Sequence, residues 1–301
     1  MTTPSADLFN KHNLPGLYQL MAGAAMISFS GVFVKLAHVG PTASGFYRML
    51  FGSILLLAVI LISGKGLQFS FKPMAIMMAC GGFFAMDLIL WHRSIIFVGP
   101  GLSTILANFQ VFFLAGFGVF MLKEKLSLKY VLSIPMGFFG LFLIIGGDWL
   151  ALDAEYKTGL LLGLLTALTY SAYLLSFRKL QSAYSEISPF FTMAVISITA
   201  SALLGAEMVL EGASFVIPDV QSWISLAAYG LFGQVFGWVL ISKGIAKVKA
   251  SRAGLILLLQ PSLAFVWDVL LFNRPAGPIE IAGCILAISG IYLGSSVGKK
   301  E

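Results

Sequence analysis

A small set of polar side chains falls inside stretches of the chain that are otherwise apolar. Asp87 is the sharpest case, and Trp91 follows it by one helical turn on the same face. A buried carboxylate could bind a cationic group of a solute or exchange a proton. The alternative is an ion pair with Arg48 or Arg93 that holds helices together, because buried opposite charges tend to pair. His92, five residues beyond Asp87, could relay a proton, although its position favours a histidine at the boundary of the apolar stretch.

Amide side chains form a second group of candidates. Asn108 and Gln110 lie close together, with Thr104 one helical turn before Asn108, and Gln260 lies 150 residues beyond Gln110. These amides could hydrogen-bond a bound solute, or tie helices together by bonds worth about 1 kcal/mol each. Helix contact is favoured for each amide taken singly, and Asn108 is the better candidate for a solute contact.

Aromatic and hydroxyl side chains accompany these groups. Gln234 and Trp238 are one turn apart, and aromatic walls suit apolar or ring-bearing solutes. Most of the 26 phenylalanines must nevertheless pack or face lipid. Trp267, beside Asp268, is as consistent with anchoring at a membrane interface as with function. The remaining candidates for solute contact are Ser28, Ser30, Tyr170 and Tyr173.

Enzyme and metal motifs are missing from the sequence. It contains no HExxH metalloprotease motif, no nucleotide-binding P-loop and no GxSxG hydrolase motif. Cys80 and Cys284 fall inside apolar stretches and are interpreted as small packing residues rather than as a disulfide or metal site. We therefore expect a protein that is not an enzyme, with no cofactor, no metal and no nucleic-acid partner.

Membrane-spanning helices must position these residues. Hydrophobic residues make up 58% of the 301 residues and charged residues 11%, which leaves too little polar surface for a soluble domain. The apolar stretches are about twenty residues long, enough to cross a hydrocarbon core of about 30 Å. We expect ten helices, over residues 15–37, 42–63, 73–92, 100–122, 127–147, 158–180, 188–210, 221–243, 251–272 and 277–297.

The two halves of the chain share a pattern. Residues 110–143 align with residues 260–293 at a constant offset of 150, and Gly140 meets Gly290. These glycines and Gly137 should permit close helix packing. A unit of five spans is odd, so the second copy must enter the bilayer from the opposite side, as in many secondary transporters. The expected fold is all-α and membrane-integral, with a tail at 1–14, a five-helix repeat at 15–147 and an inverted five-helix repeat at 158–297.

Basic residues are distributed unequally between alternate loops. If the N-terminus is cytoplasmic, fourteen lysines and arginines fall on the inner side, and Arg48 lies within a span. The excess of basic residues on the cytoplasmic side predicts that both termini are cytoplasmic. The net charge of +6 therefore reflects membrane topology. The outer side holds only Lys35, Arg93, Lys157 and Arg274.

Several of these residues together resemble a known family. The segment 122–128, Leu-Lys-Glu-Lys-Leu-Ser-Leu, is followed by a glycine-bearing stretch at 137–146. This pattern resembles the drug/metabolite transporter superfamily, and most closely its ten-helix EamA-type branch. Lys35, Arg48 within Gly-Phe-Tyr-Arg, and Gln260 before a proline also fit that branch. The resemblance covers nearly the whole chain.

The resemblance also implies where a solute would bind. It places the first, third, fourth, sixth, eighth and ninth spans around a central cavity, which would gather the polar and aromatic candidates named above. Val111 follows Gln110, whereas Pro261 follows Gln260, so the resemblance does not predict a matching kink in the first repeat.

The predicted function is secondary active transport of small organic metabolites across the cell (inner) membrane. Alternating access would arise as the two repeats rock around the central site, and the resemblance implies export. Amino acids, particularly apolar or aromatic ones, are the first choice of substrate. Nucleobase-like metabolites, quaternary amines and drugs stay open, as does coupling by proton or substrate antiport. A passive channel and, less favoured, a membrane-embedded enzyme are the alternatives. The sequence does not specify an oligomeric state, because lipid-facing and partner-facing surfaces are both apolar.

Overall fold

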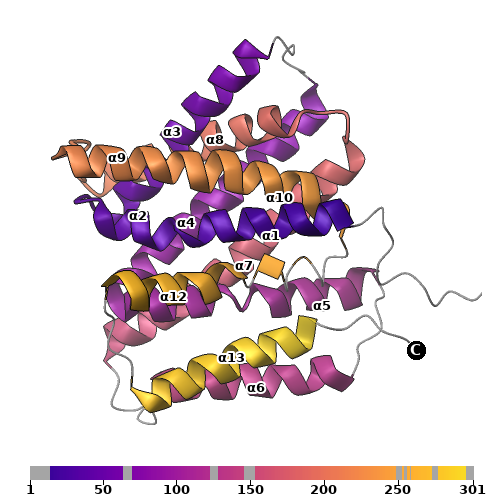
Figure 1. The fold of residues 1–301 in the computed structure, drawn as a ribbon, viewed down its shortest axis with the longest axis vertical. Helices are drawn as coiled ribbons and strands as arrows, with labels where there is room; N and C mark the ends of the chain where they lie inside the picture. Colours follow the sequence, from indigo (N-terminus) through magenta and orange to yellow (C-terminus); the bar gives the residue numbers. More distant parts are fainter. Residues whose placement is uncertain are drawn as a thin grey trace, which may run out of the picture.

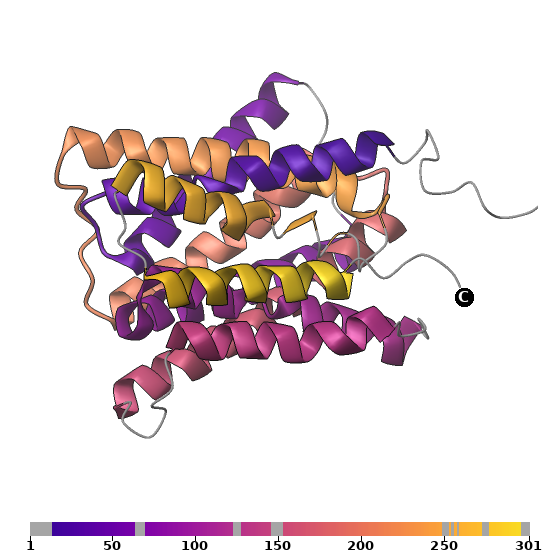
Figure 2. The ribbon, with the colours of Figure 1, turned by 60° about the horizontal axis from the view of Figure 1, so that its bottom comes forward.

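The protein is a helical bundle in which most helices run along one common direction (Figures 1 and 2). The computed structural model describes residues 14–63, 70–122, 128–145, 153–248, 253, 256–257, 259–272 and 277–295, and all regular structure in these ranges is helical. Six helical stretches are long and apolar enough to cross a membrane. The expected all-α membrane fold is confirmed, while the count of ten spans stays a prediction. The six are Pro15–Leu36, Pro41–Ile62, Phe71–Val98, Ala154–Ala183, Pro189–Leu210 and Val220–Ile245.

The first expected span, 15–37, consists of two helices. Helix α1 (Leu14–Ser28) and helix α2 (Ser30–Leu36) are separated by the single residue Phe29. The Phe29 N–H donates to the carbonyl of Met26, three residues back, at 3.4 Å, so the helical ladder is interrupted there. No proline or glycine stands at this point to predict the break. Helix α3 (Pro41–Ile62) begins with proline at its first turn, where a missing N–H costs nothing.

The expected connection between the third and fourth spans, residues 93–99, is itself helical. Helix α4 (Phe71–Ala107) continues through these residues. It is not straight, because the Ser103 hydroxyl donates to the Trp91 carbonyl at 3.2 Å. In a straight helix these residues would be about 18 Å apart. The chain therefore reverses direction between Trp91 and Ser103.

The interruption comes later, at Asn108 and Phe109, before α5 (Gln110–Leu122) begins. The Asn108 amide donates to the Thr104 carbonyl at 2.7 Å and so satisfies one of the carbonyls left open at the helix end. The first repeat thus has a break next to Gln110 without a proline, which the resemblance did not predict.

The last helices of the two halves correspond closely. Helix α6 (Leu128–Ile145) and α13 (Pro278–Ser295) begin and end 150 residues apart, and α12 (Leu259–Phe272) corresponds to α5. Helices α6 and α13 lie side by side at one edge of the bundle (Figures 1 and 2).

Glycine packing at the α6–α13 contact confirms the expected close approach. A Cβ added at Gly290 would lie 2.7 Å from the backbone nitrogen of Gly137. Any side chain at Gly290 would therefore push the two helices apart.

The second half begins with α7 (Ala154–Ala183), whose N-cap Asp153 accepts from the Tyr156 N–H at 2.6 Å. Helix α8 (Pro189–Leu210) follows. The expected span 221–243 is a continuous rod of three parts, α9 (Val220–Ala228), the π-helix η3 (Tyr229–Gly237) and α10 (Trp238–Ile245). The sequence did not predict the π-helical part. Such segments are rare and frequently occur at functional sites.

The main core lies where α3, α4, α7, α8 and α10 meet, around side chains such as Met49, Phe84 and Met193. Many large apolar side chains remain exposed on the helices, for example Leu61 and Leu210, as expected for surfaces that contact lipid. The start of α1 and the end of α13 lie at the same end of the bundle, on the right in Figure 1.

Candidate functional site

Arg48 lies in the interior between α3, α4 and η3. It shares one face of α3 with Gly45 and Gly52, at spacings of three and four residues. Its side chain is buried, with 5% exposure. Its Nη1 donates to the Tyr229 hydroxyl at 3.0 Å, and its guanidinium lies 5.4 Å from the Phe84 ring centre and 4.8 Å from that of Tyr229. In the part of the chain that the structure describes, its Nε has no hydrogen-bond partner. The cation is therefore held by aromatic rings and one hydroxyl.

Glycines on α3 make room for side chains of the neighbouring helices. A Cβ at Gly45 would lie 2.5 Å from Cε1 of His92, and a Cβ at Gly52 would lie 2.6 Å from Cβ of Gln234. On η3, a Cβ at Gly230 would lie 2.9 Å from the backbone nitrogen of Gly52. His92 and Gln234 consequently flank Arg48, each about one turn along α3.

Both flanking side chains are incompletely hydrogen-bonded. His92 is 1% exposed, and neither ring nitrogen has a hydrogen-bond partner among the described residues. The Gln234 Nε2 donates to the Ser197 hydroxyl at 2.8 Å, but its Oε1 has no partner. Each such buried atom costs about 1–3 kcal/mol, and native proteins keep few of them without a water, an ion or a functional role. The central polar cluster is defined as Arg48, Asp87, His92, Tyr229 and Gln234.

Asp87 completes the central polar cluster from α4. It is buried and interacts electrostatically with Arg48. Neither ion pair left open by the sequence is formed, since within the described residues no contact of 4.0 Å or less joins Asp87 to Arg48 or Arg93. Arg93 pairs instead with Glu207, and its Nη2 lies 3.5 Å from Glu211. The carboxyl group of Asp87 and the guanidinium of Arg48 thus share the interior without touching.

An aromatic cluster, defined as Phe84, Tyr170, Tyr173, Phe177 and Trp238, adjoins these polar groups. The rings of Phe84 and Tyr173 stack 4.6 Å apart, and the Trp238 ring meets both edge-on at 5.3 and 5.0 Å. The Tyr173 hydroxyl and the Trp238 indole nitrogen are buried without partners. Because Phe84 also lies under Arg48, the two clusters form one continuous centre with a charged part and an apolar part.

Other candidates from the sequence lie near this centre or apart from it. Trp91 packs against His92, with ring centres 5.2 Å apart. The Gln260 amide lies beside the Tyr170 hydroxyl, and its Nε2 has no hydrogen-bond partner. The Asn108 amide donates to the carbonyl of Thr104 at the end of its own helix. Asn108 is therefore not part of the central polar cluster.

Two of the remaining candidates, Gln110 and Ser28, make contacts between helices. The Gln110 carbonyl accepts from the Ser171 hydroxyl at 3.2 Å, while its Oε1 has no partner. Ser28 accepts from the Trp267 indole N–H at 2.9 Å, so that indole bonds within the protein. The Ser30 hydroxyl is buried without a partner. The Asp268 side chain lies outside the described residues.

Sequence reasoning missed Phe84, Tyr229 and the glycines on α3. Only the glycines gave a signal, because Gly45 and Gly52 bracket Arg48 on one helical face. His92 was interpreted as a boundary histidine, yet its ring is enclosed. Within the described part of the chain, no three His, Cys, Asp or Glu residues lie together as metal ligands would.

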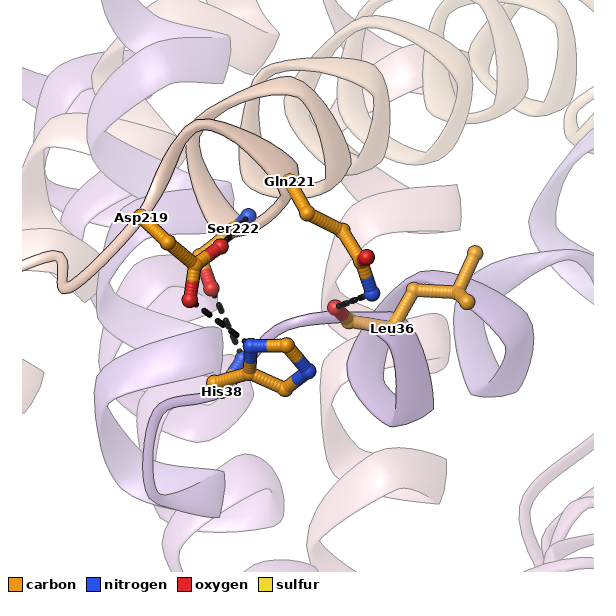
Figure 3. A network of polar contacts seen from close by, with 5 residues as sticks. All are labelled: Leu36, His38, Asp219, Gln221 and Ser222. Atoms are coloured by element: carbon orange, nitrogen blue, oxygen red, sulfur yellow. Dashed lines mark hydrogen bonds and ion pairs between the residues drawn. The ribbon is translucent and has the colours of Figure 1, made fainter.

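A second polar region joins the end of α2 to the start of α9 (Figure 3). His38 Nδ1 lies 2.7 Å from the Asp219 carboxylate, the His38 N–H donates to the Ser222 hydroxyl at 2.8 Å, and the Gln221 amide donates to the Leu36 carbonyl at 3.0 Å. These five residues are named the α2–α9 contact. It lies at the left of Figure 1, opposite the start of α1.

Asp219 is also the N-cap of α9, accepting from the Ser222 N–H at 2.8 Å. This bond, together with the His38 ring, holds the pKa of Asp219 below its ordinary value. The carboxylate is therefore charged in neutral solution.

Known proteins match the chain along nearly its whole length. The model of the EamA-like transporter family matches residues 14–146 and again 157–296. The "Uncharacterized transporter YoaV" of Bacillus subtilis is 25% identical, covering 86% of this chain and 89% of its own. A "Probable amino-acid metabolite efflux pump" of Salmonella typhimurium is 22% identical, covering 89% of each.

A solved crystal structure with a TM-score of 0.71 and 17% identity covers 94% of this chain and 97% of its own, which supports the fold alone. The two family matches together span most of the chain, and the described helices include six that can cross a membrane. The chain therefore belongs to the EamA-like transporter family and is a multi-pass membrane transporter.

Proposed function

We propose that the protein is a secondary active transporter of small organic metabolites and that its solute site comprises the central polar cluster and the aromatic cluster. One observation carries this proposal. Buried polar atoms of Arg48, His92 and Gln234 lack partners, and they lie beside an aromatic surface between helices of both halves. A polar solute could satisfy those atoms, which no lipid-facing role would require.

Amino acids with apolar or aromatic side chains are the proposed substrates. Asp87 and Arg48 present opposite charges, which suit a zwitterion, and the aromatic cluster suits an apolar body. The Salmonella relative carries the name of an amino-acid metabolite efflux pump, which supports export of this class. Nucleobase-like metabolites, quaternary amines and drugs are the competing classes, and the charged groups favour amino acids over them.

Alternating access is the proposed mechanism. Helices α3 and α4 come from the first half, and α7, η3 and α10 from the second, so a movement of one half against the other would remodel the centre. The α2–α9 contact would close one end of the path, and α2 could move about the break at Phe29. Exchange of a proton or of a second solute would complete the cycle.

Counterflow in liposomes tests the proposal. Purified protein is reconstituted in vesicles preloaded with one unlabelled amino acid, and entry of the labelled form is followed. A carrier gives saturable entry with a transient overshoot, whereas a passive channel gives entry that rises linearly with concentration. Linear entry would support the channel. Absence of flux across a broad metabolite panel, under proton gradients of both signs, would reject transport of small metabolites.

The proposed topology places ten spans in the cell (inner) membrane, with both termini cytoplasmic. Single cysteines test it in a background with Cys80→Ala and Cys284→Ala. In intact cells, Asp153→Cys should react with an impermeant thiol reagent from outside, and Lys125→Cys should not. The reverse pattern would overturn the orientation without affecting the assignment of transport.

A further inference from the structure

Arg48 carries a positive charge with no direct counter-ion among the described side chains. It is 5% exposed, and no carboxylate oxygen of a described residue lies within 4.0 Å of its nitrogens. Burying an unpaired ion is among the most expensive arrangements in a protein interior. Stacking on Phe84 and Tyr229 offsets part of that cost. An anion bound beside the guanidinium would offset the rest of that cost.

The guanidinium also has a donor, Nε, that bonds to no atom of the described residues. Nη1 is bonded to the Tyr229 hydroxyl, whereas Nε has no partner. Position 233 on η3 is glycine, and a Cβ there would lie 3.5 Å from Nε. A planar guanidinium binds a carboxylate through two parallel N–H groups of one edge. The edge containing Nε and Nη2 has the donors for such a bidentate bond.

A buried carboxyl group near Arg48 limits what could bind between them. Asp87 is buried and does not touch Arg48, so a solute with one acidic and one basic end could bridge them. Phe84 continues from Arg48 into the aromatic cluster. An inorganic anion would satisfy Arg48 alone, whereas a carboxylate on an organic solute would also use Phe84.

We infer that Arg48 recognises a carboxylate of the transported solute through its Nε–Nη2 edge. This inference rests on the proposed function and assigns the residue that would bind the carboxylate of its substrates. Arg48 is thus a substrate-contacting residue rather than only a partner of Asp87.

Pairs of solutes that differ only at the carboxylate test the inference. L-phenylalanine and L-leucine are compared with L-phenylalaninamide and L-leucinamide as competitors of counterflow and as ligands of the purified protein. The wild type should prefer each acid over its amide by about ten- to a hundredfold. Arg48→Gln should lose that preference. Arg48→Lys, which keeps the charge but not the planar edge, should reduce the preference for the acid over the amide.

Arg93→Gln is the matched control, since it makes the same substitution at an exposed arginine paired with Glu207. It should leave the acid preference unchanged. Equal handling of acid and amide by the wild type would overturn the inference, as would a preference that survives in Arg48→Gln. If Arg48→Gln does not fold, an unchanged preference in Arg48→Lys overturns it. Counterflow only of solutes that lack a carboxylate would reject the carboxylate and leave transport standing, whereas no flux of any solute would reject transport.

Discussion

Two polar regions join the first half of the chain to the second, and they differ in how their hydrogen bonds are satisfied. In the α2–α9 contact, the ring of His38 and the amide of Gln221 each meet a partner, although His38 and Asp219 are exposed by 58% and 38%. In the central polar cluster the side chains are buried, yet Arg48 and His92 keep nitrogens without partners.

The difference separates a contact from a binding site. Exposed pairs contribute little stability because water competes for them, so the α2–α9 contact can form and break at small cost. Unpartnered polar groups in the interior destabilise the fold unless something fills them. The central polar cluster is therefore poorly suited to holding helices together and well suited to a solute.

The largest expected effect comes from Asp87→Asn, which keeps the side-chain size and removes the charge. Transport should fall about ten- to a hundredfold, because a charge-assisted hydrogen bond contributes about 1.5–3 kcal/mol. Folded yield from detergent extracts should persist. Counterflow and size-exclusion profiles measure the two quantities.

The same variant also tests the scaffold alternative. If Asp87 serves only as the partner of Arg48, Asp87→Asn should lose yield. The double variant with Arg48→Gln should then recover both yield and transport, and such a recovery would contradict a role in transport.

A smaller effect is expected where α3 meets η3. In Gly52→Ala the added Cβ would lie 2.6 Å from Cβ of Gln234, so the helices must separate. We expect a loss of about 1–3 kcal/mol in stability, the usual cost of overpacking, measured as a lower Tm in detergent. Gly116→Ala is the control, because no atom of another described helix lies within 4 Å of its added Cβ. Equal melting of both variants would show that the close approach is not needed.

Tyr173→Phe should change stability in the opposite direction. The Tyr173 hydroxyl is buried without a partner among the described residues. Its removal should leave the free energy of unfolding unchanged or raise it by about 1 kcal/mol at most, measured as an equal or higher Tm. Solute affinity should fall if the solute bonds that hydroxyl. A Tm several degrees lower would reveal a structural partner for the hydroxyl and weaken the contrast with the α2–α9 contact.

The smallest effect concerns pH at the α2–α9 contact. The pKa of Asp219 is lowered from 3.8 in the folded protein, so its carboxylate stabilises the fold above that ordinary value. This contribution is lost as pH falls through the lowered folded-state pKa. Thermal unfolding between pH 7 and 3 should show it as a Tm difference between wild type and Asp219→Asn that shrinks towards acid. Parallel Tm curves over the whole range would contradict the contribution.

Much of the fold could be predicted because lipid imposes strong rules on sequence. Hydropathy alone located most helices, and the 150-residue offset predicted the corresponding bounds of α6 and α13. The breaks at Phe29 and at Asn108 could not be predicted, since neither has a proline or glycine beside it. Tertiary contacts, such as the bond of Trp267 to Ser28, accompany the first of them.

The candidate site was partly predictable for the same reason. A carboxylate or an amide inside an apolar stretch is costly, so Asp87 and Gln234 could be selected from the sequence. Phe84 and Tyr229 could not, because 26 phenylalanines and 9 tyrosines give no reason to choose one ring over another. Only the packing around Arg48 distinguishes them.

A structure of the protein saturated with a solute that it transports tests the central claim most directly. The account predicts solute atoms within hydrogen-bond distance of the Arg48 Nε and the Gln234 Oε1, with its apolar part against Phe84. A solute bound elsewhere, with Arg48 closed directly onto Asp87 or both groups bonded only to water, would contradict it.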